Sequence, residues 1–179
     1  MLQITKGELT DNEALTAAVQ GCDVIISALG PPVGISIFTF KQGTFVKPLG
    51  TIIKAARASN IKQLYILGTP TAFVPGDERN AFLKVFIGFL KIFLNQVYSE
   101  IIGLGQLLDD EAKDLDWTMY RLGMLSNGKG VTKAAKTLGT DDWVNSTYRP
   151  GVATWILDQI EKDNADWARQ KPVLYSVKT

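Results

Sequence analysis

The residues best suited to bind a ligand directly follow two apolar runs. Both runs are unbroken and mostly aliphatic, which is typical of strands buried on both faces of a parallel sheet. Ligands bind beyond the carboxyl ends of such strands, so the turns that follow form the first candidate site. Glycine lets a ligand approach the backbone closely, and threonine hydroxyls can hydrogen-bond it. The two turns are Leu29-Gly30-Pro31 and Gly68-Thr69-Pro70-Thr71.

A purely structural interpretation of these turns stays open. Leu29-Gly30-Pro31 also suits a tight turn at the exit of a strand, and Thr69 and Thr71 could cap their own turn. Tyr98 is a further candidate because a tyrosine hydroxyl can protonate a carbonyl when a nearby cation lowers its pKa. The position four residues later is Ile102, however, so Tyr98 lacks the cation that would activate it and is interpreted mainly as a packing residue.

The composition excludes several kinds of chemistry. The 179 residues contain no histidine, which removes Ser-His and Cys-His nucleophile pairs and the commonest metal ligand, and we expect no metal site. Nineteen basic and eighteen acidic residues are interspersed, so we expect no nucleic-acid partner. The lone Cys22 and the absence of a signal-like start predict a cytoplasmic protein.

The elements that position these residues alternate as in a doubly wound α/β sheet, and the length suits a single domain over residues 1–179. We expect strands at residues 2–5, 23–29, 63–67, 116–121 and 173–177, with residues 23–29 central and residues 173–177 at the edge. We expect helices that begin near Thr10, Pro48, Ala81, Tyr98 and Arg149. Residues 31–46 and 126–135 are interpreted as loops.

The most hydrophobic segment covers residues 81–94. It is too short for a transmembrane helix of roughly 20 residues, and Lys84 and Lys91 share one face. The leading interpretation is a helix packed on the core or on a partner subunit. The second is a helix lying at a membrane surface, although we do not expect a membrane partner.

Several blocks in order resemble the atypical short-chain dehydrogenase/reductases, especially the NmrA-like and biliverdin/flavin-reductase-like NAD(P)-binding proteins. The blocks are Lys6-Gly7-Glu8-Leu9-Thr10-Asp11, residues 17–30, Thr51-Ile52-Ile53-Lys54-Ala55-Ala56 and Leu115-Asp116-Trp117-Thr118-Met119-Tyr120-Arg121.

The resemblance implies a Rossmann-like, mostly parallel sheet and an NAD(P) cofactor. It places Glu8 and Leu9 near the adenosine, and Leu29, Gly30 and Pro31 along the ribose and pyrophosphate. It places Thr69 and Thr71 near the nicotinamide ribose, and Leu122 and Gly123 near the nicotinamide.

The chain departs from this family at its start. The resemblance implies two further strands and a glycine-rich turn before Leu2, so we expect an N-terminally truncated Rossmann fold; no G-x-x-G-x-x-G is present to bind pyrophosphate. The gap would leave one edge of the strand at residues 23–29, and one edge of the strand at residues 2–5, without a neighbouring strand. We therefore expect either that residues 2–5 move over to pair with residues 23–29 or that the exposed edge pairs with another chain.

Two functions follow. The first is an NAD(P)H-dependent oxidoreductase acting on a small carbonyl or conjugated substrate, with activity and cofactor binding left open in this chain. The second is a non-catalytic regulatory or scaffold protein that has lost dinucleotide binding. Self-association through the exposed strand edge or through residues 82–94 is the expected protein contact.

Overall fold

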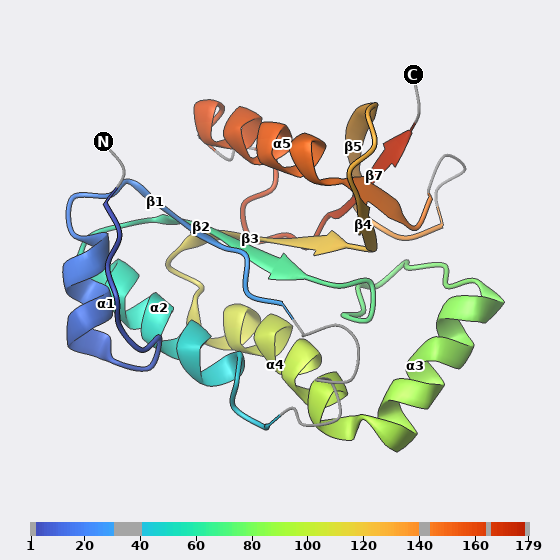
Figure 1. The fold of residues 1–179 in the computed structure, drawn as a ribbon, viewed down its shortest axis with the longest axis horizontal. Coiled ribbons are helices and arrows are strands. Elements are labelled where there is room, and N and C mark those ends of the chain that lie inside the picture. The colour runs from blue at the N-terminus through green and yellow to red at the C-terminus, as the bar shows by residue number, and fades with distance from the viewer. Residues whose placement is uncertain (1–2, 31–40, 140–143, 164–165, 178–179) are drawn as a thin grey trace.

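The computed structural model describes residues 3–30, 41–139, 144–163 and 166–177, and these form a layered α/β fold. A five-stranded sheet in the order β1-β2-β3-β7-β5 runs through its middle (Figure 1). The strands are β1 (Val24–Ser27), β2 (Gln63–Gly68), β3 (Asp116–Leu122), β7 (Val173–Val177) and β5 (Val131–Ala135). The first four run parallel, and β5 runs antiparallel to β7. This confirms the prediction of a mostly parallel, Rossmann-like sheet.

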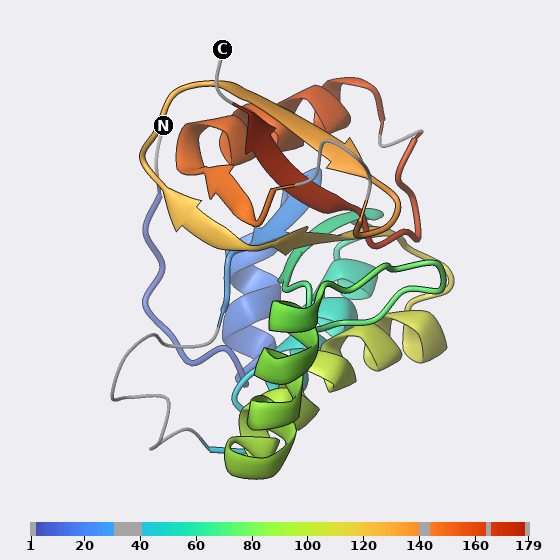
Figure 2. The same ribbon diagram turned by 90° about the vertical axis from the view of Figure 1, so that its right-hand side faces the viewer.

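Helices cover both faces of this sheet. Figure 1 shows α1 (Asn12–Val19), α2 (Val46–Ala58) and α4 (Asn95–Glu111) on one face and α5 (Arg149–Glu161) on the other. The remaining helix, α3 (Ala81–Phe93), extends from the periphery and meets α4 at a bend of 112° (Figure 2). Helices on both faces of a parallel sheet are the doubly wound arrangement that the sequence predicted.

Two apolar cores lie on the two faces. The larger packs α2 and α4 against alternate residues of β2 and β3, including Leu64, Ile66 and Met119. The smaller packs α5 against the opposite side of the same strands, including Tyr65 and Tyr120. Because successive strand residues point to opposite faces, β2 and β3 need apolar residues at nearly every position.

Three strand predictions were wrong. Residues 3–5 form no strand, and Ile4 is 87% exposed, so within the described residues no re-pairing with β1 occurs. β1 has one neighbour, β2, and therefore lies at the edge of the described sheet, whereas β7 lies inside it between β3 and β5. The predicted loop at residues 126–135 contains β5, because β7 offers it a hydrogen-bonding edge. Residues 31–40 of the other predicted loop lie outside the described residues.

A second, two-stranded sheet was not predicted. β4 (Met124–Ser126) follows β3 after Gly123 and pairs in parallel with β6 (Ser146–Tyr148). Three residues per strand are too few to show an apolar period, so the sequence carries no signal for it. This small sheet therefore lies at the carboxyl end of β3.

Candidate functional site at the carboxyl edge of the sheet

Three parallel strands bring most of the predicted residues to one edge. The register sets Ser27 beside Ile66 and Gly68 beside Arg121, so the chain leaves β1, β2 and β3 on the same side of the sheet. Leu29 and Gly30, then Thr69 and Thr71, then Leu122 and Gly123 follow these three ends. Their common location is the one that ligands use in open α/β sheets.

At the end of β1, the face of the sheet that carries α2 and α4 is filled by side chains, and the opposite face is open. Leu29 packs against the larger core, and a cavity of only about 10 Å³ remains between it and Phe45. Ile26, which points to the other side, is 50% exposed. Among the described residues, the open side of β1 is therefore the one that Ile26 faces.

Gly30 and Tyr120 fix how β1 leaves the sheet. A Cβ on Gly30 would lie 2.7 Å from Leu67 Cδ2, so a larger residue would require the Leu67 side chain to shift. The Tyr120 hydroxyl donates to the Ser27 carbonyl oxygen at 2.9 Å, and burial raises the pKa of Tyr120 to about 12. The phenol is thus a fixed donor that ties β1 to β3.

Thr69 and Thr71 form a local turn after β2. The Thr71 backbone N–H donates to Thr69 Oγ1 at 3.3 Å, and the Ala72 N–H donates to the Thr69 carbonyl at 3.0 Å. Thr71 is buried, whereas Thr69 is half-buried at the strand end. The structural role left open for these residues is therefore present, and Thr69 is the one that remains accessible to a ligand.

A buried ion pair holds that turn against β3. The side chains of Arg121 and Asp77 have no exposed surface, and their N–O distance is 2.6 Å. The guanidinium also donates to the carbonyl oxygens of Ala72 at 3.0 Å, Lys136 at 3.2 Å and Lys171 at 2.7 Å. One side chain thus joins the turn after β2 to the segments that precede β7 and follow β5, which fixes this part of the edge.

The same carboxylate organises the backbone around it. Asp77 accepts hydrogen bonds from the backbone N–H of Val74 at 2.9 Å and of Leu138 at 2.8 Å. Sequence analysis missed Arg121 and Asp77 as site residues. They are 44 positions apart, and no local pattern pairs them.

Leu122 and Gly123 complete the edge beside Asn145. Leu122 is buried, and a Cβ on Gly123 would lie 3.0 Å from Asn145 Cγ and 3.1 Å from its carbonyl oxygen. Asn145 Oδ1 is buried and has no hydrogen-bond partner within the described part of the chain. A buried amide oxygen normally accepts a hydrogen bond, so this oxygen marks a place for a donor.

A buried carboxylate occupies the N-terminus of α2. Glu100 from α4 accepts the backbone N–H of Gly43 at 2.6 Å, of Phe45 at 2.8 Å and of Val46 at 3.0 Å. It supplies the anion that a helix N-terminus favours and satisfies donors that a phosphate would otherwise use. Sequence analysis missed this contact, because 54 residues separate Glu100 from Val46 and no local pattern pairs them.

Tyr98 is positioned by packing and has a cation beside its ring. It lies half-buried in α4, and Lys91 Nζ stands 5.1 Å from the centre of its ring. The cation near Tyr98 is therefore Lys91 of α3, which faces the ring, whereas the residue four positions after Tyr98 is Ile102.

The remaining predicted residues lie before α1 or outside the description. Glu8 and Leu9 are exposed, and the Glu8 carbonyl accepts the Asp11 N–H at 3.0 Å in the turn that enters α1. Asp11 then caps α1 by accepting from the N–H groups of Glu13 and Ala14. Pro31 lies outside the described residues.

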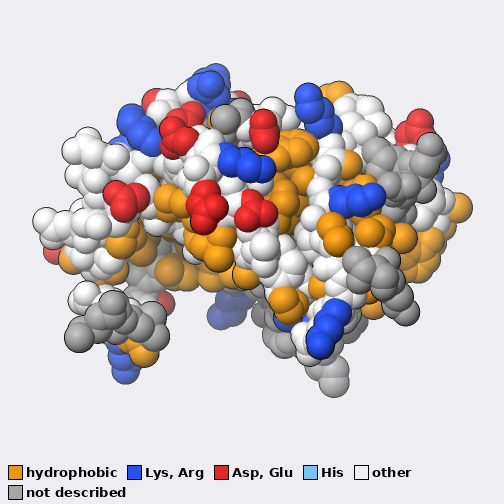
Figure 3. All heavy atoms as spheres, turned by 90° about the horizontal axis from the view of Figure 1, so that it is seen from above, with side chains coloured by type: hydrophobic (Ala, Val, Ile, Leu, Met, Phe, Trp, Pro, Cys, Tyr) orange, Lys and Arg blue, Asp and Glu red, His pale blue; other side chains and the backbone are white. Residues whose placement is uncertain are grey.

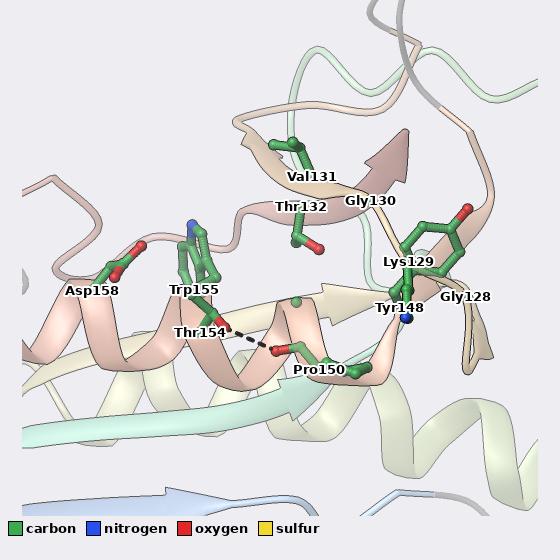
Figure 4. A pocket seen from close by; sticks show the side chains of 11 residues that line it. Gly128, Lys129, Gly130, Val131, Thr132, Tyr148, Pro150, Thr154, Trp155 and Asp158 are labelled. Atoms are coloured by element: carbon green, nitrogen blue, oxygen red, sulfur yellow. Dashed lines mark hydrogen bonds between the residues drawn. The ribbon is translucent and has the colours of Figure 1, made fainter. Parts of the chain in front are cut away.

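A separate hollow of about 490 Å³ lies along α5 and shares no lining residue with this edge (Figure 4). Tyr148 and Trp155 supply aromatic surface, and Lys129 and Asp158 lie toward opposite ends. Thr132 Oγ1 in its wall is already hydrogen-bonded to Ser176 Oγ at 2.7 Å.

Neither a patch of like charge on the face seen from above nor a cluster of metal-binding side chains in the described residues indicates a second site. The face seen from above, over α5, carries acidic and basic side chains side by side (Figure 3). Within the described ranges, no group of three or more His, Cys, Asp or Glu residues could hold a metal ion. No single described helix is long and apolar enough to cross a membrane, and α3 and α4 reach that composition only as a bent pair.

The edge fits one half of a nicotinamide dinucleotide and not the other. The buried Asn145 Oδ1 beside Gly123 lacks a hydrogen-bond donor, and a carboxamide N–H is a donor of the right kind. The helix N-termini of α1 and α2, by contrast, are already capped by the carboxylates of Asp11 and Glu100, which would repel a pyrophosphate. The N-termini of α1 and α2 therefore offer no free backbone donors to a pyrophosphate.

Comparisons with solved structures give the fold. A short-chain dehydrogenase/reductase from Veillonella parvula has a TM-score of 0.75 at 16% identity, and the match covers 97% of this chain and 72% of that one. A wide-type enzyme from the same organism, solved with NADP, has a TM-score of 0.70 at 18% identity over 94% of this chain and 69% of that one. The anaerobilin reductase ChuY from Escherichia coli O157:H7 has a TM-score of 0.64 at 18% identity over 99% and 76%.

At such identities the likeness concerns the fold alone. A search of curated proteins found no match. The sequence model of the NAD(P)H-binding family, however, matches residues 1–163, which is most of the chain. The chain therefore belongs to the NAD(P)H-binding family.

Proposed function

We propose that the protein is an NAD(P)H-dependent oxidoreductase that reduces a small carbonyl or conjugated substrate at the carboxyl edge of β1, β2 and β3. The observation that carries the proposal is the gathering of Thr69, Leu122 and Gly123 at this edge in a chain of the NAD(P)H-binding family. Hydride chemistry comes from such a cofactor, and the protein supplies binding and orientation.

The nicotinamide half is the part that this chain is proposed to hold. Leu122 offers apolar contact, Gly123 permits close approach, and Asn145 Oδ1 is an acceptor in need of a donor. Arg121 and Asp77 act as positioning residues, because they fix the segments on either side without an exposed atom. The proposed setting is the cytoplasm, where the free, exposed thiol of Cys22 would stay reduced.

A titration with cofactor fragments tests this proposal. Reduced nicotinamide mononucleotide, NADPH and NADH should each change nicotinamide fluorescence, whereas ADP-ribose should not compete. Asn145→Leu should weaken nicotinamide binding about tenfold, the equivalent of roughly 1.4 kcal/mol for one hydrogen bond. Gln106→Leu, at an exposed position of α4, is the matched amide control and should bind as the parent does.

Turnover is a separate readout. Oxidation of NADPH, followed by its absorbance, should depend on an added small aldehyde, ketone or conjugated acceptor. If neither reduced nicotinamide mononucleotide, NADPH nor NADH binds, the oxidoreductase proposal is wrong.

That negative result would favour the second candidate, a non-catalytic regulatory or scaffold protein. Its specific support is the pair of carboxylates at the helix N-termini, Asp11 at α1 and Glu100 at α2, together with Ile102 in place of a lysine. Such a protein would keep the fold and its protein contacts without binding a dinucleotide.

A further inference from the structure

α3 carries two apolar stripes with the same spacing. The first consists of Leu83, Ile87, Leu90 and Leu94, which are 3–8% exposed and pack inward. The second consists of Phe82, Phe86, Phe89 and Phe93, which are 43–70% exposed. Both follow the 4-3-4 spacing of a helix seam that packs against another helix. The second stripe, named here the phenylalanine seam, has no such partner among the described residues.

The seam is continuous and preformed. Phe82 and Phe86 stack with ring centres 6.3 Å apart, and Phe89 and Phe93 lie 5.0 Å apart. Val85 and Ile92, each 74% exposed, widen the seam on one flank. Exposed apolar surface gathered in this way marks an interaction site, unlike scattered single residues.

The order of residues along α3 is nearly the same in both directions. Reading outward from the middle of the helix gives Phe86 and Phe89, then Lys84 and Lys91, then Phe82 and Phe93. Two copies of such a helix in antiparallel contact present the same side chains to each other. A two-fold symmetric interface needs that self-complementarity.

The two lysines favour a second copy over a membrane surface. At 100° per residue, Lys84 and Lys91 lie on the side of α3 opposite Phe89. The Lys91 ammonium is directed at the ring of Tyr98 on its own chain, 5.1 Å from the centre. A helix at a membrane surface carries several Lys or Arg residues on its polar face, whereas α3 offers only these two, and Lys91 already faces a ring of its own chain.

The exposed area is sufficient for a stable contact. Four phenylalanines, one valine and one isoleucine at these exposures present on the order of 700 Å² of apolar surface, since an aromatic side chain offers roughly 150–250 Å². Two copies would bury up to about twice that area, and that upper bound lies within the size range of specific interfaces.

We propose that the protein forms a homodimer in which α3 of each copy packs antiparallel against α3 of the other through the phenylalanine seam. Phe86 then meets Phe89 of the second copy, and Phe82 meets Phe93. This inference does not depend on the oxidoreductase function.

Sedimentation equilibrium of the full chain in the micromolar range tests the dimer. The parent should be dimeric, and Phe86→Ser with Phe89→Ser should be monomeric with an unchanged circular dichroism spectrum. Leu157→Ser removes a 57% exposed apolar side chain from α5 and should remain dimeric. A monomeric parent, or a dimer that survives both serine substitutions, would overturn the proposal.

Disulfide trapping tests the antiparallel direction in a Cys22→Ser background. Mixed Phe82→Cys and Phe93→Cys proteins should form a crosslinked heterodimer on mild oxidation, and neither protein alone should crosslink. Crosslinking of Phe82→Cys with itself would show parallel helices and contradict the model. Flotation of a monomeric parent with phosphatidylglycerol vesicles would assign the seam to a membrane surface instead.

Discussion

The carboxyl edge of the sheet is built differently at its two ends. At β3, a guanidinium with no exposed surface bonds a carboxylate and three carbonyl groups from separate segments. At β1, a four-residue strand has a single neighbour in the described sheet and leaves Ile26 half exposed. Preorganisation is therefore concentrated at the end that would hold the nicotinamide, and the β1 end relies on its contact with β2 and on one phenol.

The largest expected loss in the free energy of unfolding comes from breaking the ion pair between Arg121 of β3 and Asp77. Arg121→Met leaves the Asp77 carboxylate buried without its partner and should lower the free energy of unfolding by about 3–5 kcal/mol, measured by urea denaturation. Arg57→Met removes a partner of Asp114 at the surface, where both side chains are about half exposed, and should cost less than about 1 kcal/mol. Equal losses in the two variants would show that the buried pair is not the anchor.

A smaller difference in stability loss should appear between alanine substitutions in the neighbouring strands β2 and β1. Leu64→Ala in β2 empties a fully buried position and should cost about 2–5 kcal/mol. Ile26→Ala in β1 removes a side chain that is already 50% exposed and should cost less than about 1.5 kcal/mol. If Ile26→Ala proves as costly as Leu64→Ala, β1 is covered in solution by something outside the described chain.

On the β1 side of the molecule, Glu100 makes the most hydrogen bonds of the side chains described above, all of them to the start of α2. Glu100→Gln removes the charge from three backbone hydrogen bonds at the start of α2 and should cost about 1–3 kcal/mol in the same denaturation measurement. Glu111→Gln, an exposed carboxylate at the end of α4, is the control and should change stability by less than about 0.5 kcal/mol.

The smallest expected effect concerns the phenol that joins the two ends. Tyr120→Phe should cost about 1 kcal/mol, because the Ser27 carbonyl loses its donor. Tyr65→Phe should be close to neutral at pH 7, because the buried Tyr65 hydroxyl has no partner in the described structure. The reverse order would mean that Tyr65, not Tyr120, ties the strands.

Both phenols also make stability depend on alkaline pH. Burial raises the pKa of Tyr120 to about 12, and burial together with the Asp163 charge raises the pKa of Tyr65 to about 12. An unfolded tyrosine ionises near pH 10, so the unfolded chain loses these protons first. Stability should be complete below about pH 10 and fall as the pH rises toward about 12, and each Tyr→Phe variant should fall less steeply.

The sequence predicted the elements whose signal is local. The apolar runs of β2 and β3, the start of α3 at Ala81 and the start of α5 at Arg149 agree with the structure. Residues 2–5 alternate like a strand, but a strand needs a neighbour, and residues 3–5 have none in the described sheet. The weakly apolar residues of β5 form a strand because β7, which lies 38 to 46 positions further along the chain, pairs with them.

The site shows the same division. The strand ends were predictable, because the sheet order follows from the alternation of strands and helices. The contacts of Arg121 with Asp77 and of Glu100 with α2 were not, since each joins segments about 44 to 57 residues apart. Whether Glu8, Leu9, Thr69 and Gly123 contact a nucleotide stays a prediction.

The buried ion pair of Arg121 and Asp77 also determines which segments unfold locally together. Residues 69–77 have no strand or helix of their own, and such segments ordinarily exchange their amide protons quickly. Here the amides of Val74 and Leu138 donate to the carboxylate that Arg121 holds, so releasing either one requires disruption of the same buried pair. These two amides, 64 positions apart, should therefore exchange as one cooperative unit together with β3.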